Sequence, residues 1–78
     1  MREKVRSSIE HIKNDVKERR FGRALLSISN LRNRITSDRL YAAEKSLAEW
    51  LDGFHSGTVD RMELEMREEV IGLLKEIE

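Results

Sequence analysis

The two histidines are the first candidates for chemistry, because histidine can ligate a metal or transfer a proton near neutral pH. His55 follows Asp52 in an Asp-x-x-His spacing, which resembles the carboxylate-x-x-His pairs that bind iron in di-iron helical bundles. A di-iron site needs a second such pair, and His11 lies in a different segment with no comparable motif around it. We therefore expect His55 to lie at the surface near a helix end, and we expect no metal site.

Carboxylates, serines and glycines are the other groups that can support catalysis. An acidic cluster is formed by Glu63, Glu65, Glu68 and Glu69. At these spacings the carboxylates point around most of a helix, which indicates a solvated face rather than a carboxylate cage. No Gly-x-Ser-x-Gly elbow, phosphate-binding glycine loop or cysteine occurs in the sequence. The sequence therefore predicts a protein that is not an enzyme, with no catalytic residue, no cofactor and no small-molecule substrate.

The charges are distributed unevenly along the chain, although the formal net charge is zero. Residues 1–39 contain eleven Lys and Arg against five Asp and Glu, a net charge of +6. Residues 40–78 contain four against ten, a net charge of −6. The basic half can therefore bind phosphates, or it can pair with the acidic half, either within one chain or between two chains.

Nucleic-acid binding through the basic half is the alternative function that this asymmetry suggests. The candidate phosphate contacts are Arg19, Arg20, Arg23, Arg32, Arg34 and Arg39. Arginine suits phosphate recognition, because its planar guanidinium group binds two oxygens at once. Against this function, the isoelectric point is near neutral, and Phe21 is the one aromatic residue among these arginines that can stack on a base. The competing interpretation is a solvated arginine face that pairs with the acidic half.

These groups must be positioned by helices, because apolar residues recur at helical spacing along the chain. The first two stripes comprise Val5, Ile9, Ile12 and Val16, and then Phe21, Ala24, Leu25, Ile28, Leu31 and Ile35. Gly22 predicts a turn or kink between the two stripes, and the alternative is one helix that continues through Gly22. Ser37 or Thr36 is expected to cap the third helix.

The third and fourth helices are predicted in the same way. The third stripe comprises Leu40, Ala43, Leu47, Trp50 and Phe54, and the fourth Val59, Met62, Met66, Val70, Leu73 and Ile77. Gly53 and Gly57 are expected to bracket the end of the third helix. Thr58 is then predicted as the N-cap of the fourth helix, with Asp60 in its first turn.

These patterns predict an all-α fold, a small bundle of about four short helices arranged as two helical hairpins in one helical domain over residues 1–78. A domain of this size buries only about 60% of the surface of its unfolded chain, so its core is thin. We do not expect the charged segment from Met1 to Arg20 to be a signal peptide, and no stretch approaches the roughly 20 apolar residues of a membrane span. We therefore expect a cytoplasmic protein with no membrane contact.

Apolar residues beside the main stripes predict an interaction surface. The predicted protein-interface residues are Trp50, Leu51, Leu64 and Ile71. Leu51, Leu64 and Ile71 fall beside the stripes, as does Leu26, and tryptophan is a common interface anchor. The competing interpretation is that these residues only widen the intramolecular core. Because the core is thin, we expect a non-catalytic protein–protein interaction module, namely a small oligomeric subunit, adaptor or inhibitor-type regulator that binds itself or a larger protein.

Overall fold

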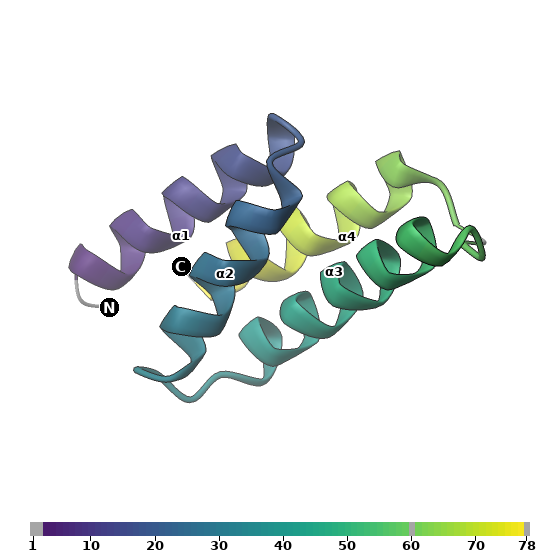
Figure 1. The fold of residues 1–78 in the computed structure, drawn as a ribbon. Helices are drawn as coiled ribbons and strands as arrows, with labels where there is room; N and C mark the ends of the chain where they lie inside the picture. The colour runs from purple at the N-terminus through teal and green to yellow at the C-terminus, as the bar shows by residue number, and fades with distance from the viewer. Residues whose placement is uncertain (1–2, 60, 78) are drawn as a thin grey trace.

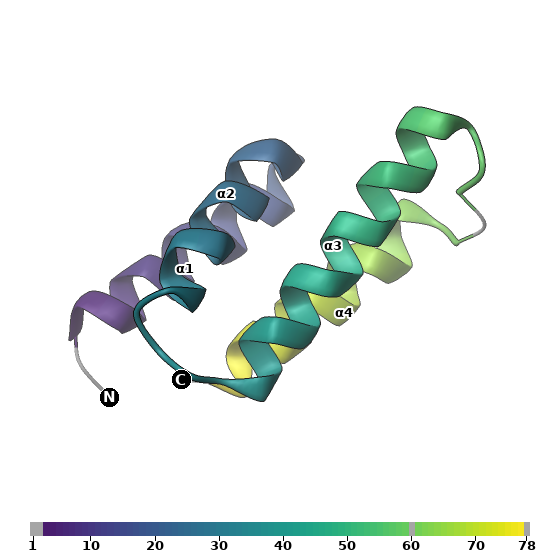
Figure 2. The ribbon, with the colours of Figure 1, turned by 60° about the horizontal axis from the view of Figure 1, so that its bottom comes forward.

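The computed structural model describes residues 3–59 and 61–77, and within these ranges its regular elements are all helices. They are α1 (Glu3–Lys17), α2 (Phe21–Arg32), α3 (Asp38–Ser56) and α4 (Glu63–Lys75). Successive helices run in opposite directions, so that α1 pairs with α2 and α3 pairs with α4 (Figure 1). Further contacts between α2 and α3 and between α1 and α4 join the two hairpins (Figure 2). The prediction of an all-α bundle of four helices is confirmed.

The turn between α1 and α2 lies slightly before the predicted position. Arg19 has a φ angle of 64°, a left-handed conformation that is uncommon for residues other than glycine. The Asp15 carbonyl accepts a hydrogen bond from the Arg20 N–H, and Asp15 Oδ1 pairs with Arg20 Nε, both at 2.8 Å. Gly22 lies inside the first turn of α2. The expected break is therefore centred on Arg19, and the alternative of a helix that continues through Gly22 is wrong.

Local capping signals position both ends of α3. Ser37 Oγ accepts a hydrogen bond from the Leu40 N–H at 3.2 Å, so Ser37 rather than Thr36 is the N-cap. Gly57 ends the helix with a φ angle of 76°, and its N–H bonds to the Phe54 carbonyl. The predicted role of Gly57 is confirmed.

The start of α4 differs from the prediction. The helix begins at Glu63, so Thr58 does not cap it. Val59 and Met62 precede the helix and do not contribute to its buried stripe. The predicted position of Asp60 lies outside the described residues.

Tertiary contacts explain the late start of α4, because they hold the preceding segment against α3. Trp50 Nε1 donates a hydrogen bond to the Arg61 carbonyl at 3.2 Å. A Cβ atom added to Gly53 would lie 3.1 Å from the Val59 Cα, which shows how closely the two backbones approach. The prediction of Thr58 as the N-cap used residue types alone, and residue types do not reveal contacts between distant parts of the chain.

The core is formed by apolar side chains from all four helices that are at most 8% exposed. They are Ile9, Ile12, Val16, Phe21, Ala24, Ile28, Leu31, Leu40, Ala43, Leu47, Trp50, Met66, Val70 and Leu74. On α4 the fully buried residues are Met66, Val70 and Leu74, whereas the predicted Leu73 and Ile77 are only partly buried. No helix in the described part of the chain is both long and apolar enough to cross a lipid bilayer.

Candidate interaction surfaces

An aromatic row runs from the core to the surface at the end of the bundle where α3 ends. Phe21, the first residue of α2, contacts Trp50 edge to face at a ring distance of 5.4 Å. Phe54 stacks on the Trp50 ring at a ring distance of 5.3 Å. Phe54 lies one helical turn beyond Trp50, past the start of α2, so no helix covers it. Trp50 is therefore a core residue at 7% exposure, whereas Phe54 is 58% exposed although it continues the same stripe.

Exposed apolar side chains are concentrated in the stretch of chain from Phe54 to Leu64. Four of the six exposed large hydrophobic residues in the described part of the chain lie between residues 54 and 64, and they form what we call the turn-end patch. Its members are Phe54 (58% exposed), Val59 (38%), Met62 (65%) and Leu64 (51%). Together these four half-exposed side chains present on the order of 400 Å² of apolar surface, about as much as the largest apolar patch of a typical monomer.

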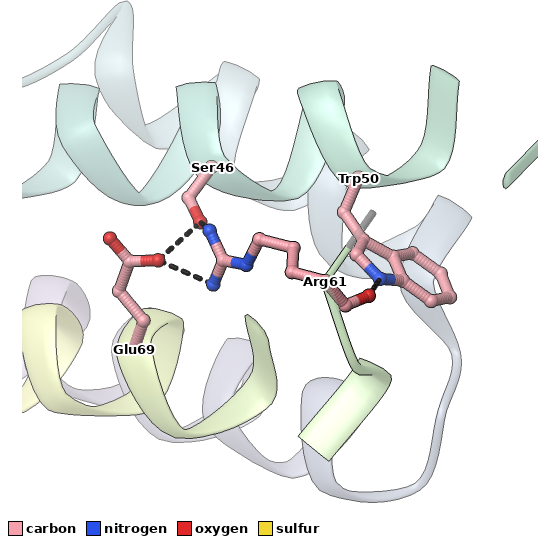
Figure 3. A network of polar contacts seen from close by, with 4 residues as sticks. All are labelled: Ser46, Trp50, Arg61 and Glu69. Carbon is pink, nitrogen blue, oxygen red and sulfur yellow. Dashed lines mark hydrogen bonds and ion pairs between the residues drawn. The ribbon is translucent and has the colours of Figure 1, made fainter. Parts of the chain in front are cut away.

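Polar contacts hold the segment that carries this patch (Figure 3). The Arg61 side chain lies between α3 and α4, where its Nη2 pairs with Glu69 Oε2 at 2.5 Å and its Nη1 donates to Ser46 Oγ at 3.3 Å. Ser46 Oγ also donates to Glu69 Oε2 at 3.0 Å. The Arg61 backbone carbonyl accepts from Trp50 Nε1. We call these four residues the Arg61 network, and they attach Arg61 to α3 and α4 through both its backbone carbonyl and its side chain.

The charge of Glu69 is stabilised within this network. Burial alone raises the pKa of the Glu69 carboxyl, because it disfavours the charged form. Hydrogen bonds from Arg61 and Ser46, together with the positive charge of Arg61, outweigh burial and hold the pKa below its usual value of 4.5. Glu69 therefore stays ionised at neutral pH and keeps its bond to Arg61.

A cavity of about 260 Å³ lies between the second half of α3 and the following segment. Its lining includes Trp50, Glu49, Asp52, Val59 and Arg61. The described residues contain no group of three histidines or carboxylates that could hold a metal ion. His55 is exposed in the last turn of α3, where its ring contacts Phe54 at 6.0 Å, and this confirms its expected surface position.

The four predicted interface residues lie at different depths. Trp50 belongs to the core, Leu51 and Ile71 are partly buried against it, and Leu64 is half exposed. Leu64 and Ile71 are seven residues apart and therefore share one face of α4. The assignment of these four residues to an interface stays a prediction, and within it Leu64 offers the most free surface.

Helical spacing also places these residues on different sides of the α3–α4 pair. Leu51 lies seven residues after Glu44, which pairs with Arg32 of α2, so Leu51 faces α2. Ile71 lies two residues, or about 200°, from Glu69, which faces α3. Ile71 and Leu64 therefore point away from α3, and the structure does not bring the four residues together.

The sequence reasoning missed three members of the turn-end patch, because it assigned them to buried stripes. Phe54 completes the periodic pattern of α3, and Val59 and Met62 were read as the start of α4. The sequence did contain one indication that Phe54 is exposed. Phe54 lies between Gly53 and Gly57, where the helix is expected to end, and an apolar residue at a helix end can lack a neighbouring helix to pack against.

Most of the candidate arginines pair with carboxylates of the same chain. Three pairs join the basic half to the acidic half, namely Arg19–Glu63 (3.2 Å), Arg32–Glu44 (2.6 Å) and Arg39–Glu76 (2.6 Å). Arg20 pairs with Asp15 inside the α1–α2 turn. Arg23 and Arg34 form no ion pair with any carboxylate among residues 3–59 and 61–77. Folding of one chain therefore neutralises much of the charge asymmetry, and Arg23 and Arg34 are the two candidates that it leaves available.

No protein-family model matches the chain, and no curated protein or solved structure matches it either.

Proposed function

We propose that the protein is a non-catalytic protein–protein interaction module that binds through the turn-end patch, as a small oligomeric subunit, an adaptor or an inhibitor-type regulator. The observation that carries this proposal is the position of Phe54. Its ring stacks on the buried Trp50 and extends the core stripe to the surface, yet more than half of the residue is exposed. A partner that covers Phe54 would continue the core of the bundle, which is how apolar anchors act in interfaces.

The contacts that Arg61 makes next to Met62 support the same proposal. Phe54 sits on α3, and Arg61, which directly precedes Met62, is held to α3 and α4 by the Arg61 network. A surface that is ordered before binding loses less conformational entropy when a partner arrives. The patch is therefore suited to a stable contact.

Self-association is the first form of this proposal. A standard interface buries about 800 Å² per partner, which is more than the turn-end patch alone presents. The patch would therefore form the apolar centre of the interface, and the polar residues around it would form the rim. Two copies related by a twofold axis would place their Phe54 rings in one apolar centre. A larger protein that offers an apolar groove is the other partner of this class, and a cytoplasmic location stays a prediction from the sequence.

Light scattering after size-exclusion chromatography tests the self-association form. Wild-type protein is expected to show a mass that is a multiple of the 9.2 kDa chain at micromolar concentrations. The double variant Met62→Glu/Leu64→Glu is expected to run as a monomer, because charges cannot be buried there without partners. Leu26→Glu is the matched control, since Leu26 is 64% exposed on α2 and lies outside the patch.

Two results would contradict this form. One is a wild-type protein that stays monomeric over the whole concentration range. The other is an equal loss of association in the patch variant and in Leu26→Glu. Circular dichroism must show the same helicity for all three proteins, so that unfolding does not account for the result.

A further inference from the structure

The α1–α2 hairpin carries a polar groove on its outer side. A cavity of about 280 Å³ between the two helices is lined by Ser8, His11, Ser27, Asn30 and Arg34. A smaller hollow adjoins it, since Arg34 also lines a cavity of about 90 Å³ together with Lys4, Val5 and Ile35. Every residue of the larger cavity comes from α1, α2 or the turn that follows α2. We call this feature the α1–α2 groove.

Helical spacing aligns more donors along the α1–α2 groove. On the α2 side, Arg23 lies four residues before Ser27 and therefore shares the face that continues through Asn30 to Arg34. On the α1 side, Lys4, Ser8 and His11 form the matching row. These seven residues are Lys4, Ser8, His11, Arg23, Ser27, Asn30 and Arg34, and none of them is acidic.

The charge of the groove is available to a ligand. Arg23 and Arg34 are both exposed, and they are the two candidate arginines without a carboxylate partner in the described part of the chain. Asp15 continues the α1 row, but its carboxylate is paired with Arg20. The groove therefore presents cationic groups and hydrogen-bond donors with no free acid among them.

The acidic half of the chain does not face this groove. α3 meets α2 through Glu44, which accepts a hydrogen bond from Ser29 at 2.6 Å and pairs with Arg32. Ser27 lies two residues before Ser29, which places it about 200° around the helix, on the side away from α3. The α3–α4 hairpin, with its excess of carboxylates, therefore packs on the side of α2 opposite to Ser27.

We propose that the α1–α2 groove binds the phosphate backbone of a nucleic acid. Arg23 lies nine residues before the end of α2 at Arg32, which corresponds to about 14 Å along the helix axis, and Arg34 follows in the turn beyond. One strand of a duplex carries a charge about every 3.4 Å of its axis, so the groove spans several phosphates and is longer than a single phosphate ion needs. The seven groove residues include no aromatic ring other than His11, so the contacts are made with phosphates and carry little sequence preference. This site is separate from the turn-end patch, and either can fail without the other.

Fluorescence anisotropy with a labelled oligothymidylate tests this proposal. Wild-type protein is expected to bind at low salt and to release the strand as salt rises. The double variant Arg23→Gln/Arg34→Gln is expected to lower the salt slope by about 1.4, which at 0.1 M salt corresponds to roughly 25-fold weaker binding. Lys45→Gln/Lys75→Gln is the matched control, because it removes the same charge from exposed positions on α3 and α4, and its binding is expected to stay close to that of wild type. Circular dichroism verifies that both variants are folded.

Two further experiments distinguish a nucleic acid from other ligands that carry phosphate. Inorganic phosphate is expected to displace the strand no better than sodium chloride of equal ionic strength, and displacement at much lower concentration would indicate a site for one phosphate ion. Vesicles of phosphatidylcholine with phosphatidylserine are expected to bind more weakly than the strand. The proposal is overturned by the absence of oligothymidylate binding at low salt, by equal weakening in the two double variants, or by selective displacement with inorganic phosphate.

Discussion

Replacement of Trp50 by alanine separates a core role from a surface role for this residue. Trp50 is 7% exposed, contacts Phe21 and Phe54, and donates a hydrogen bond to the Arg61 carbonyl. Truncation of a buried tryptophan costs about 3–5 kcal/mol in free energy of unfolding. A chain of 78 residues has roughly 4–12 kcal/mol in total, so the variant is expected to lose a large part of its stability.

Urea denaturation followed by circular dichroism measures this loss, since Trp50 is the sole tryptophan and its fluorescence disappears in the variant. With a slope of about 1 kcal/mol per molar urea, the midpoint is expected to fall by about 3 M or more. Trp50→Phe keeps an aromatic ring but loses the donor to Arg61, and we expect a smaller loss of about 1–2 kcal/mol. Leu64→Ala is the exposed control, with a loss below about 1 kcal/mol. A loss of less than 1 kcal/mol in Trp50→Ala would refute the core role of Trp50.

Further predictions concern the ends of the helices and the Arg61 network, and denaturation at controlled pH checks each of them. Gly57→Ala is expected to lower the free energy of unfolding by about 1 kcal/mol, because alanine is strained at positive φ. Gly22→Ala is expected to raise it by about 0.5–1 kcal/mol, because Gly22 lies in open space within α2. Equal effects of the two substitutions would contradict this reasoning. Ser37→Ala is expected to lower the free energy of unfolding by about 1 kcal/mol, because the N-cap of α3 is lost, and Thr36→Ala is expected to lower it much less. A larger effect of Thr36→Ala would show that Thr36, and not Ser37, is the N-cap. Glu69 has a lowered pKa when folded, so its ionised form stabilises the fold above pH 4.5, and this contribution is lost as the pH falls through the folded pKa. Glu69→Gln is therefore expected to lower stability by less than about 1 kcal/mol at pH 7, with a difference that fades below pH 4.5; a constant difference would contradict the pKa assignment.

The helices were predictable because they follow from local pattern. Leu40, Ala43, Leu47 and Trp50 keep a helical period, and all four are buried in the structure. Ser37 and Gly57 act at the ends of α3 through hydrogen bonds to residues within one turn, which sequence patterns represent well. The fold class therefore followed from periodicity and caps.

The surfaces depended on contacts between distant residues. Thr58 has the residue type of an N-cap, but the contact between Trp50 and Arg61 holds the chain in a different path. Phe54 has the spacing of a core residue, and only the position of α2 decides that it is left uncovered. The charge asymmetry was visible in the sequence, whereas pairs such as Arg19–Glu63 join residues far apart in the chain and required the fold.

The turn-end patch is tested most directly by site-specific photo-crosslinking in cells. A photoreactive benzoylphenylalanine is placed at position 62 in one sample and at position 26 in another, because Met62 and Leu26 are exposed to nearly the same extent, 65% and 64%. We predict a discrete crosslinked product from position 62, either a dimer of the chain or a complex with one larger protein, and no comparable product from position 26. Equal products from both positions, or none from position 62, would contradict the proposal that this patch is where the protein binds its partner.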